Sequence, residues 1–149
     1  MNAQNNAARV AVMAKPCQKQ FCRPGTGQMP TVQQAMHMAC AVVSESLRAA
    51  VQAACANGQW RDEYQDVIFS AEAALDAVER LEAEMPTDPD DFDAQWWRAT
   101  SVARLARDAF PDANAAASLA LQTAVRDFEA LYRVVDFLAI KAEQEGGAA

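Results

Sequence analysis

Apolar side chains recur in alternating steps of four and three residues through most of this chain, and few folds accept that spacing. An α-helix completes a turn in about 3.6 residues, so side chains at these steps lie along one side of it. Over 67–85 the repeating residues are Val67, Ala71, Ala74, Val78, Leu81 and Met85. Comparable stripes follow over 32–54, 92–110 and 121–139. With alanine as the commonest residue and only 5 glycines, the sequence predicts an all-α protein, an antiparallel four-helix bundle with short loops.

Residues that favour helix ends mark the borders of the first helix. Thr31 followed three residues later by Gln34 matches a capping box, in which each side chain satisfies a free backbone N–H of the other residue. Asn57-Gly58 suits the end of this helix, because both residue types tolerate the left-handed conformation found there.

Prolines mark the later borders. The second helix is predicted from about Trp60 to Met85, and Pro86 ends it because proline lacks a backbone N–H. Asp88 is the expected N-cap of the third helix, with Pro89 at the first helical position. The fourth helix is expected to begin after Pro111.

The chain divides into an arm, a bundle and a tail. Residues 1–30 contain several prolines and glycines, show no sustained period and carry four basic residues without an acidic one. We therefore predict a flexible basic N-terminal arm over 1–30, the helical bundle over 31–145 and a short tail over 146–149.

The fourth helix has an unusually broad apolar face. Its stripe consists of Leu121, Val125, Phe128, Tyr132, Val135 and Ala139, and Leu131, Val134 and Leu138 widen it. A face this wide indicates either a central helix or one that meets a second copy of the protein, so a homodimer is one expectation.

Charge is divided unevenly along the sequence. Residues 61–93 carry twelve acidic residues against two arginines, and the whole chain has a net charge of −7. This balance disfavours direct binding of nucleic acid and favours a partner with a basic protein surface. The alternative is that the acidic residues form a solvated face that keeps the protein soluble.

Targeting signals are not evident in the sequence. No apolar stretch approaches the ~20 residues of a membrane span, and the first residues lack the apolar core of a signal peptide. We therefore expect a cytoplasmic protein without a membrane contact, in which Cys17, Cys22, Cys40 and Cys55 are reduced thiols.

Two adjacent tryptophans supply a candidate contact surface. Neighbouring residues on a helix point about 100° apart, so both rings cannot enter one core. Trp96 fits the apolar stripe, and Trp97 then lies either at the surface as a partner anchor or over the groove between the third and fourth helices. The predicted partner-binding residues are Asp62, Glu63, Asp66, Asp88, Asp90, Asp91, Asp93, Trp97 and Arg98.

The sequence offers little for catalysis. It contains a single histidine, and neither a nucleophile elbow nor a phosphate-binding loop is present. We assign no catalytic residue, cofactor or metal and predict a protein that is not an enzyme. One alternative remains open, because Cys17, Cys22, His37 and Cys40 could together close a tetrahedral zinc site.

Two stretches resemble known families. Residues 21–75 resemble small uncharacterised proteins of pseudomonads at Phe21, Gly27, Pro30, Ala35, Met36 and Ala39. Residues 41–134 are similar to an all-helical anti-CRISPR family of pseudomonad phages through S-L-R-A-A-V, R-D-E-Y, D-D-F-D-A-Q-W-W-R and L-Q-T-A-V-R-D-F-E-A-L-Y-R. The most specific element is Trp96-Trp97-Arg98 after the acidic loop, whereas the N-terminal arm departs from the pattern. This second resemblance implies an inhibitor of the type I CRISPR helicase-nuclease.

These observations lead to one functional hypothesis and two alternatives. The hypothesis is a phage- or mobile-element-encoded, non-enzymatic inhibitor or modulator that binds a bacterial nucleic-acid-processing (CRISPR) machine through an acidic, tryptophan-containing surface. The alternatives are a small zinc-binding regulatory or adaptor module and a structural homodimeric bundle.

Overall fold

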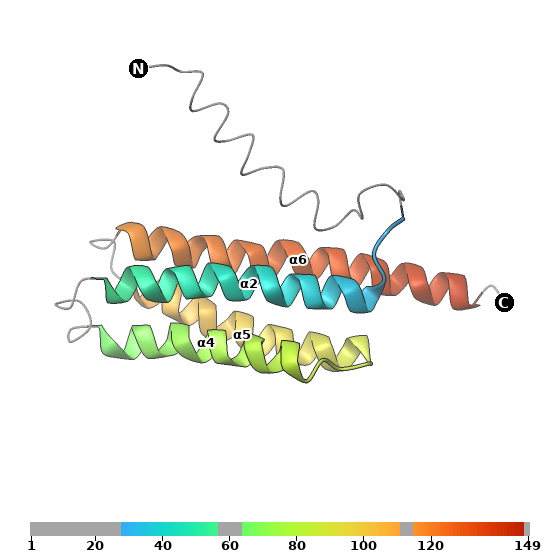
Figure 1. The fold of residues 1–149 in the computed structure, drawn as a ribbon, viewed down its shortest axis with the longest axis horizontal. Helices are drawn as coiled ribbons and strands as arrows, with labels where there is room; N and C mark the ends of the chain where they lie inside the picture. Colours follow the sequence, from blue (N-terminus) through green and yellow to red (C-terminus); the bar gives the residue numbers. More distant parts are fainter. Residues whose placement is uncertain (1–27, 57–63, 111–114, 148–149) are drawn as a thin grey trace, which may run out of the picture.

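The computed structural model describes residues 28–56, 64–110 and 115–147, and within these ranges the chain forms four helices. The helices are α2 (Val32–Cys55), α4 (Gln65–Ala83), α5 (Pro89–Ala109) and α6 (Ala115–Gly147). Figure 1 shows them running side by side, each antiparallel to the next. The predicted all-α, antiparallel four-helix bundle is confirmed.

The helices occupy the corners of a four-sided bundle. Both α2 and α5 pack against α4 and α6, so α2 lies diagonally across from α5 and α4 diagonally across from α6. This order places the acidic helix α4 and the long helix α6 at opposite corners (Figure 1).

Two predicted helix starts are present as expected. At α2 the backbone N–H of Gln34 donates to Thr31 Oγ1 at 3.2 Å, and the backbone N–H of Thr31 donates to Gln34 Oε1 at 3.0 Å. At α5 the carboxylate of Asp88 accepts from the backbone N–H of Asp90 at 2.9 Å, with Pro89 as the first helical residue. Both caps satisfy N–H groups that have no partner inside the helix.

The borders of α4 differ from the prediction. The helix begins at Gln65 rather than near Trp60 and ends at Ala83 instead of Met85. In the first turn of α4 the fully buried residue is Ile68, whereas the predicted Val67 is only half-buried. The buried stripe is therefore shifted by one residue there. Trp60, the Asn57-Gly58 pair and most of the predicted arm lie outside the described residues.

The predicted stripe of α5 is buried along its whole length, from Phe92 to Phe110. At its centre the ring of Trp96 lies 5.3 Å from Phe92 and 4.9 Å from Phe128, measured between centroids. The indole N–H of Trp96 donates to the backbone carbonyl of Phe128 at 3.1 Å. Trp96 therefore joins α5 to α6 by packing and by a buried hydrogen bond.

The buried stripe of α6 is displaced from the predicted one toward the residues that were expected only to widen it. Leu131 and Leu138 are buried, whereas Tyr132 and Ala139 are half-buried. The helix continues to Gly147, and at 33 residues it is about 50 Å long. Figure 1 shows its C-terminal turns extending beyond the other three helices.

We expect Trp96→Ala to lower the free energy of unfolding by about 3–5 kcal/mol, because it removes a fully buried ring and its hydrogen bond to the Phe128 carbonyl. Urea unfolding followed by circular dichroism measures the change. Leu105→Ala on the exposed side of the same helix is the control and should stay within about 0.5 kcal/mol of the wild type. Equal losses in the two variants would contradict the central role of Trp96.

Candidate functional site

The predicted partner-binding residues lie in separate parts of the structure. Asp62 and Glu63 lie outside the described residues. Asp66 is exposed in the first turn of α4, about 25 Å along that helix from its C-terminal end. Asp88 lies beyond that end, in the turn to α5. Asp66 and Asp88 therefore lie near opposite ends of α4.

Three of the predicted aspartates do lie together at the α4–α5 turn. Asp88, Asp90 and Asp91 are exposed there. They also stabilise α5 locally, since acidic groups in a first turn interact favourably with the positive end of the helix dipole. The turn is held against α2, where the side-chain amide of Gln33 donates to the Pro86 carbonyl at 3.0 Å.

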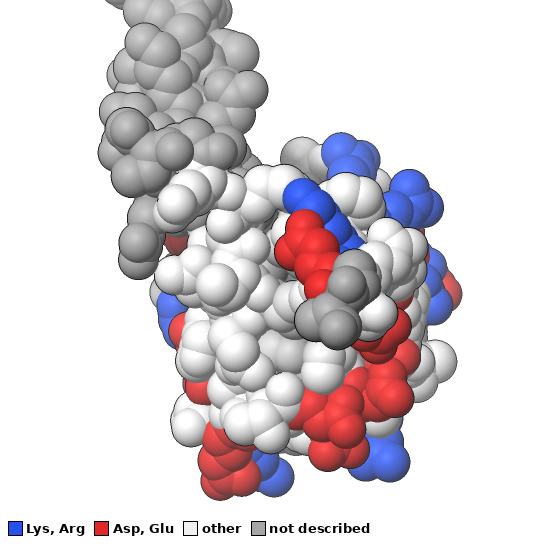
Figure 2. Space-filling model, turned by 90° about the vertical axis from the view of Figure 1, so that its right-hand side faces the viewer, with Lys and Arg blue, Asp and Glu red and all other residues white. Residues whose placement is uncertain are grey.

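Further acidic residues extend this group along α4. We define the acidic edge as Glu72, Asp76, Glu79, Glu82, Glu84, Asp88, Asp90 and Asp91. Among ion pairs between described residues, only the 2.7 Å contact from Arg48 to Glu79 involves this set. Figure 2 views the bundle from the end with the α4–α5 turn and shows acidic side chains gathered over its lower half. The acidic edge is thus a largely uncompensated negative surface.

Trp97 does not lie on this surface. It is half-buried, with its ring centroid 4.9 Å from that of Tyr132 on α6. The guanidinium of Arg104 lies 5.3 Å from the ring centroid and also pairs with Glu129 at 2.7 Å. Of the two interpretations of Trp97, these contacts match the one in which the ring covers the groove between α5 and α6.

Asp93 belongs to the same groove. It is half-buried, and its Oδ1 atom is buried without a hydrogen-bond partner among the described residues. Burial, and then the negative charge of Asp93, raise the pKa of the Tyr132 hydroxyl above its usual range. Arg98, the last predicted site residue, is exposed on α5. The structure thus brings together Asp93 and Trp97 and leaves Arg98 apart from them.

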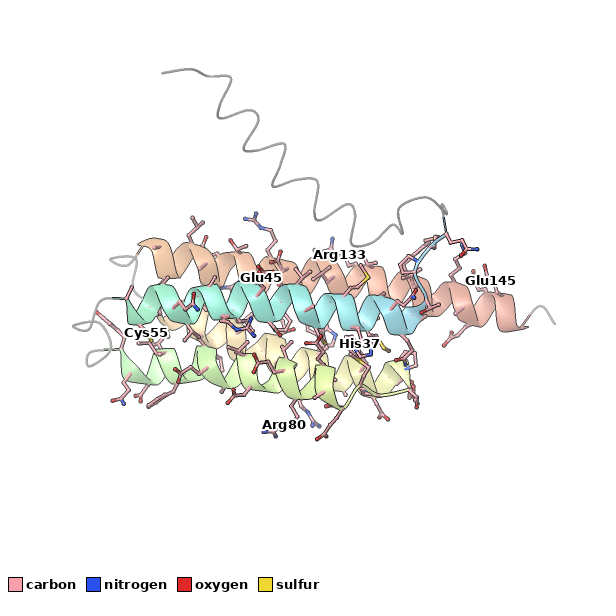
Figure 3. The ribbon with its side chains drawn as sticks, viewed as in Figure 1. His37, Glu45, Cys55, Arg80, Arg133 and Glu145 are labelled. Carbon is pink, nitrogen blue, oxygen red and sulfur yellow. The ribbon has the colours of Figure 1, made fainter. Side chains whose placement is uncertain are left out.

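The zinc alternative loses support at the two candidate ligands that can be described. His37, labelled in Figure 3, is exposed, whereas Cys40 is fully buried, so the two side chains do not lie on one accessible face of α2. Burial, reinforced by the charge of Glu82, raises the pKa of the Cys40 thiol to about 12. Zinc binds the thiolate form, which this environment disfavours. Cys17 and Cys22 lie outside the described residues.

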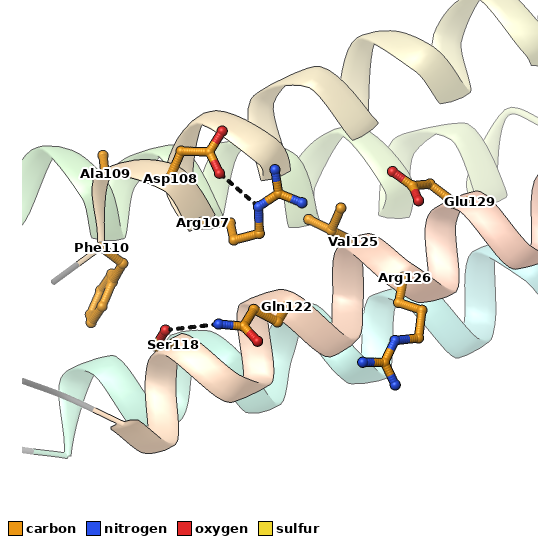
Figure 4. Close-up of a pocket in the computed structure, with 9 residues that line it drawn as sticks. All are labelled: Arg107, Asp108, Ala109, Phe110, Ser118, Gln122, Val125, Arg126 and Glu129. Carbon is orange, nitrogen blue, oxygen red and sulfur yellow. Dashed lines mark hydrogen bonds and ion pairs between the residues drawn. The ribbon is translucent and has the colours of Figure 1, made fainter. Parts of the chain in front are cut away.

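A polar cavity between the end of α5 and the start of α6 was not found by sequence reasoning. It has a volume of about 710 Å³, and Figure 4 shows the residues that line it. Arg107 Nε donates to Asp108 Oδ1 at 2.8 Å, which lowers the pKa of that carboxyl. The lining carries two basic residues, Arg107 and Arg126, and two acidic ones, Asp108 and Glu129. Because these formal charges balance, the cavity has no net preference for an anionic ligand.

An apolar groove between α2 and α6 was also missed. Its lining consists of Val42, Glu45, Ser46, Ala49, Ala116, Leu119, Ala120 and Thr123. Small residues on both helices leave the groove shallow, and Leu119 stands exposed at its border. The helical spacing of apolar residues predicts only the core face of each helix. It could not reveal this groove, because the residues that line it lie on the flanks of the two helices.

Comparison of the chain with protein-family models, curated proteins and solved structures gives no match. Within the described residues, no helix is both long and apolar enough to cross a membrane. Any functional conclusion therefore depends on the surfaces described above.

The buried thiol gives a pH dependence. Unfolding returns the Cys40 pKa from about 12 toward 9.0, so between these values the unfolded chain loses a proton that the folded chain keeps. Stability from this group is complete below about pH 9 and falls above it, by up to about 1.4 kcal/mol per pH unit. Urea unfolding from about pH 8 to about pH 10.5 should show this fall in the wild type relative to Cys40→Ala. Parallel curves would contradict it.

The packing of Trp97 on Tyr132 should appear as an energetic coupling. In a double-mutant cycle with Trp97→Ala and Tyr132→Ala, we expect a coupling of about 0.5–1.5 kcal/mol in unfolding experiments, because the two rings contact each other. Trp97→Ala combined with Leu119→Ala should be additive, since Leu119 lies about 20 Å from Tyr132 along α6. Additivity in both cycles would mean that Trp97 has no energetic contact with Tyr132.

Proposed function

We propose that the protein is a non-enzymatic binding protein whose acidic edge docks on a basic surface of another protein. The observation that carries the proposal is the uncompensated charge of this edge. Residues 64–93 contain ten acidic residues and one arginine, and only Glu79 pairs with a cation among the described residues. Like charges held this close repel one another, so their clustering costs stability that a cationic partner would recover.

Electrostatic steering follows from this arrangement. A negative surface of this kind accelerates encounter with a basic partner and fixes orientation more than it raises affinity. It also makes binding sensitive to salt, because exposed charges are screened over about 8–10 Å near physiological ionic strength. Trp97 is no longer the proposed anchor, since it is packed against Tyr132.

The kind of partner follows from its surface chemistry. Bacterial machines that process nucleic acid carry extended basic clefts, which an acidic helix edge can occupy in place of a phosphate backbone. An inhibitor or modulator of such a machine, encoded by a phage or mobile element, is the finer form of the proposal. The sequence resemblance to the anti-CRISPR family supports the same class of target.

The test removes the charge while keeping the fold. The variant Asp76→Asn, Glu84→Gln, Asp90→Asn, Asp91→Asn should lose an affinity-purified partner that the wild type captures from bacterial lysate and mass spectrometry identifies. Binding of the purified partner should weaken at least tenfold between about 0.1 M and about 0.5 M salt.

The matched control removes four acidic groups from α6, through Asp136→Asn, Glu143→Gln, Glu145→Gln and Glu129→Gln. It should keep the partner, because these residues are not part of the acidic edge. Circular dichroism must show the same helicity in both variants. Equal capture by the wild type and the acidic-edge variant would mean that the acidic edge only serves solubility.

A further inference from the structure

The outer face of α6 carries exposed apolar side chains that the bundle does not use. Leu119 is 63% exposed, Phe137 56% and Ile140 48%. Leu119 and Phe137 are eighteen residues apart, which is five helical turns, so they lie on one line along the helix about 27 Å from each other. Large apolar groups aligned in this way are typical of an interaction surface.

The apolar groove between α2 and α6 lies at the other end of this line, next to Leu119. The same face therefore carries a projecting ring, Phe137, and a groove that could receive one. We propose that this face binds a second copy of the chain, with the two α6 helices antiparallel and Phe137 of each copy seated in the α2–α6 groove of the other.

The spacing makes this arrangement self-consistent. A twofold axis that passes between the two α6 helices, level with Phe128, is midway between Leu119 and Phe137 along each helix. One rotation about it therefore brings Phe137 of each copy opposite Leu119 of the other. Such a contact is closed, because each copy presents the same surface and nothing remains for a third copy. In-register parallel helices would instead set Phe137 against Phe137 and groove against groove, so neither ring would enter a groove.

Charge complementarity favours the same orientation. Arg126 and Arg133 are exposed on α6, and Glu45 is exposed on the neighbouring α2. Figure 3 labels Arg133 and Glu45. Ser46 donates to Asp127 at 2.6 Å, which places Glu45 level with the axis, between the two arginines along the helix. In the antiparallel pair, Glu45 of each copy lies level with the stretch between Arg126 and Arg133 of the other. The two Arg126 residues come near each other at the axis, where both Glu45 side chains are also close, whereas in-register parallel helices would set both Arg126 and Arg133 against their own counterparts.

The available area is at the lower end of what a specific dimer needs. With the twofold axis level with residue 128, the two α6 helices overlap over 115–141, which is about 40 Å, and a strip about 15 Å wide covers on the order of 600 Å² per copy. Specific protein–protein interfaces bury about 1,200–2,000 Å² in total, which is about 600–1,000 Å² on each partner. The strip contains the exposed side chains of Leu119, Phe137 and Ile140, so exposed apolar surface lies where the contact is proposed.

The experiment is sedimentation velocity of the purified full chain over about 1–100 μM. We expect a dimer whose dissociation constant rises at least tenfold in Leu119→Glu and in Phe137→Glu. The control Leu105→Glu should change it less than twofold, since Leu105 is 67% exposed on α5, away from this face. Circular dichroism should show unchanged helicity in all three variants.

A charge exchange tests the orientation. Glu45→Arg and Arg133→Glu should each weaken the dimer, and the double variant should recover at least half of the lost association free energy. A monomeric wild type over the whole range, dimers unaffected by Leu119→Glu and Phe137→Glu, or no recovery in the double variant would each overturn the proposal. Because only purified protein is used, these outcomes are independent of the proposed partner of the acidic edge.

Discussion

The contact between α5 and α6 depends on Trp96. Its ring lies between Phe92 of its own helix and Phe128 of α6, and its N–H is satisfied by the Phe128 carbonyl. A carbonyl inside a helix normally accepts from within that helix, so this one accepts a second hydrogen bond through its other lone pair. The bond fixes the height of α5 against α6, and thereby the positions of Trp97 and Arg104 over the groove.

The other helix pairs are held differently. Alanine lines much of the remaining core, with residues such as Ala39, Ala74 and Ala103 fully buried. Small side chains let the helix axes approach closely, but they give little directional specificity. Polar contacts at the margins supply that specificity, and Arg48–Glu79 and Ser46–Asp127 join α2 to α4 and to α6, respectively.

The fold could be predicted from the sequence because its signals are local. Caps and prolines mark the helix ends, and the helical period alone was enough to predict the buried stripe of α5. The site could not be predicted in the same way, because it depends on which helices become neighbours. Trp97 is a surface residue by periodicity and becomes half-buried only when Tyr132 of α6 lies against it. Likewise, Asp66 and Asp88 belong to one acidic run in the sequence, yet a whole helix separates them.

The two proposed surfaces are compatible with each other because of the order of the helices. Helices α4 and α6 occupy opposite corners of the bundle, so a contact through α6 would leave the acidic edge of α4 facing outward in both copies. Such a dimer would present two negative edges, and a partner with two basic sites would bind it with increased avidity if the spacing fits. A monomer would present one edge and depend on its intrinsic affinity. If both proposals hold, the association state of the α6 face would determine how strongly the same acidic surface can act.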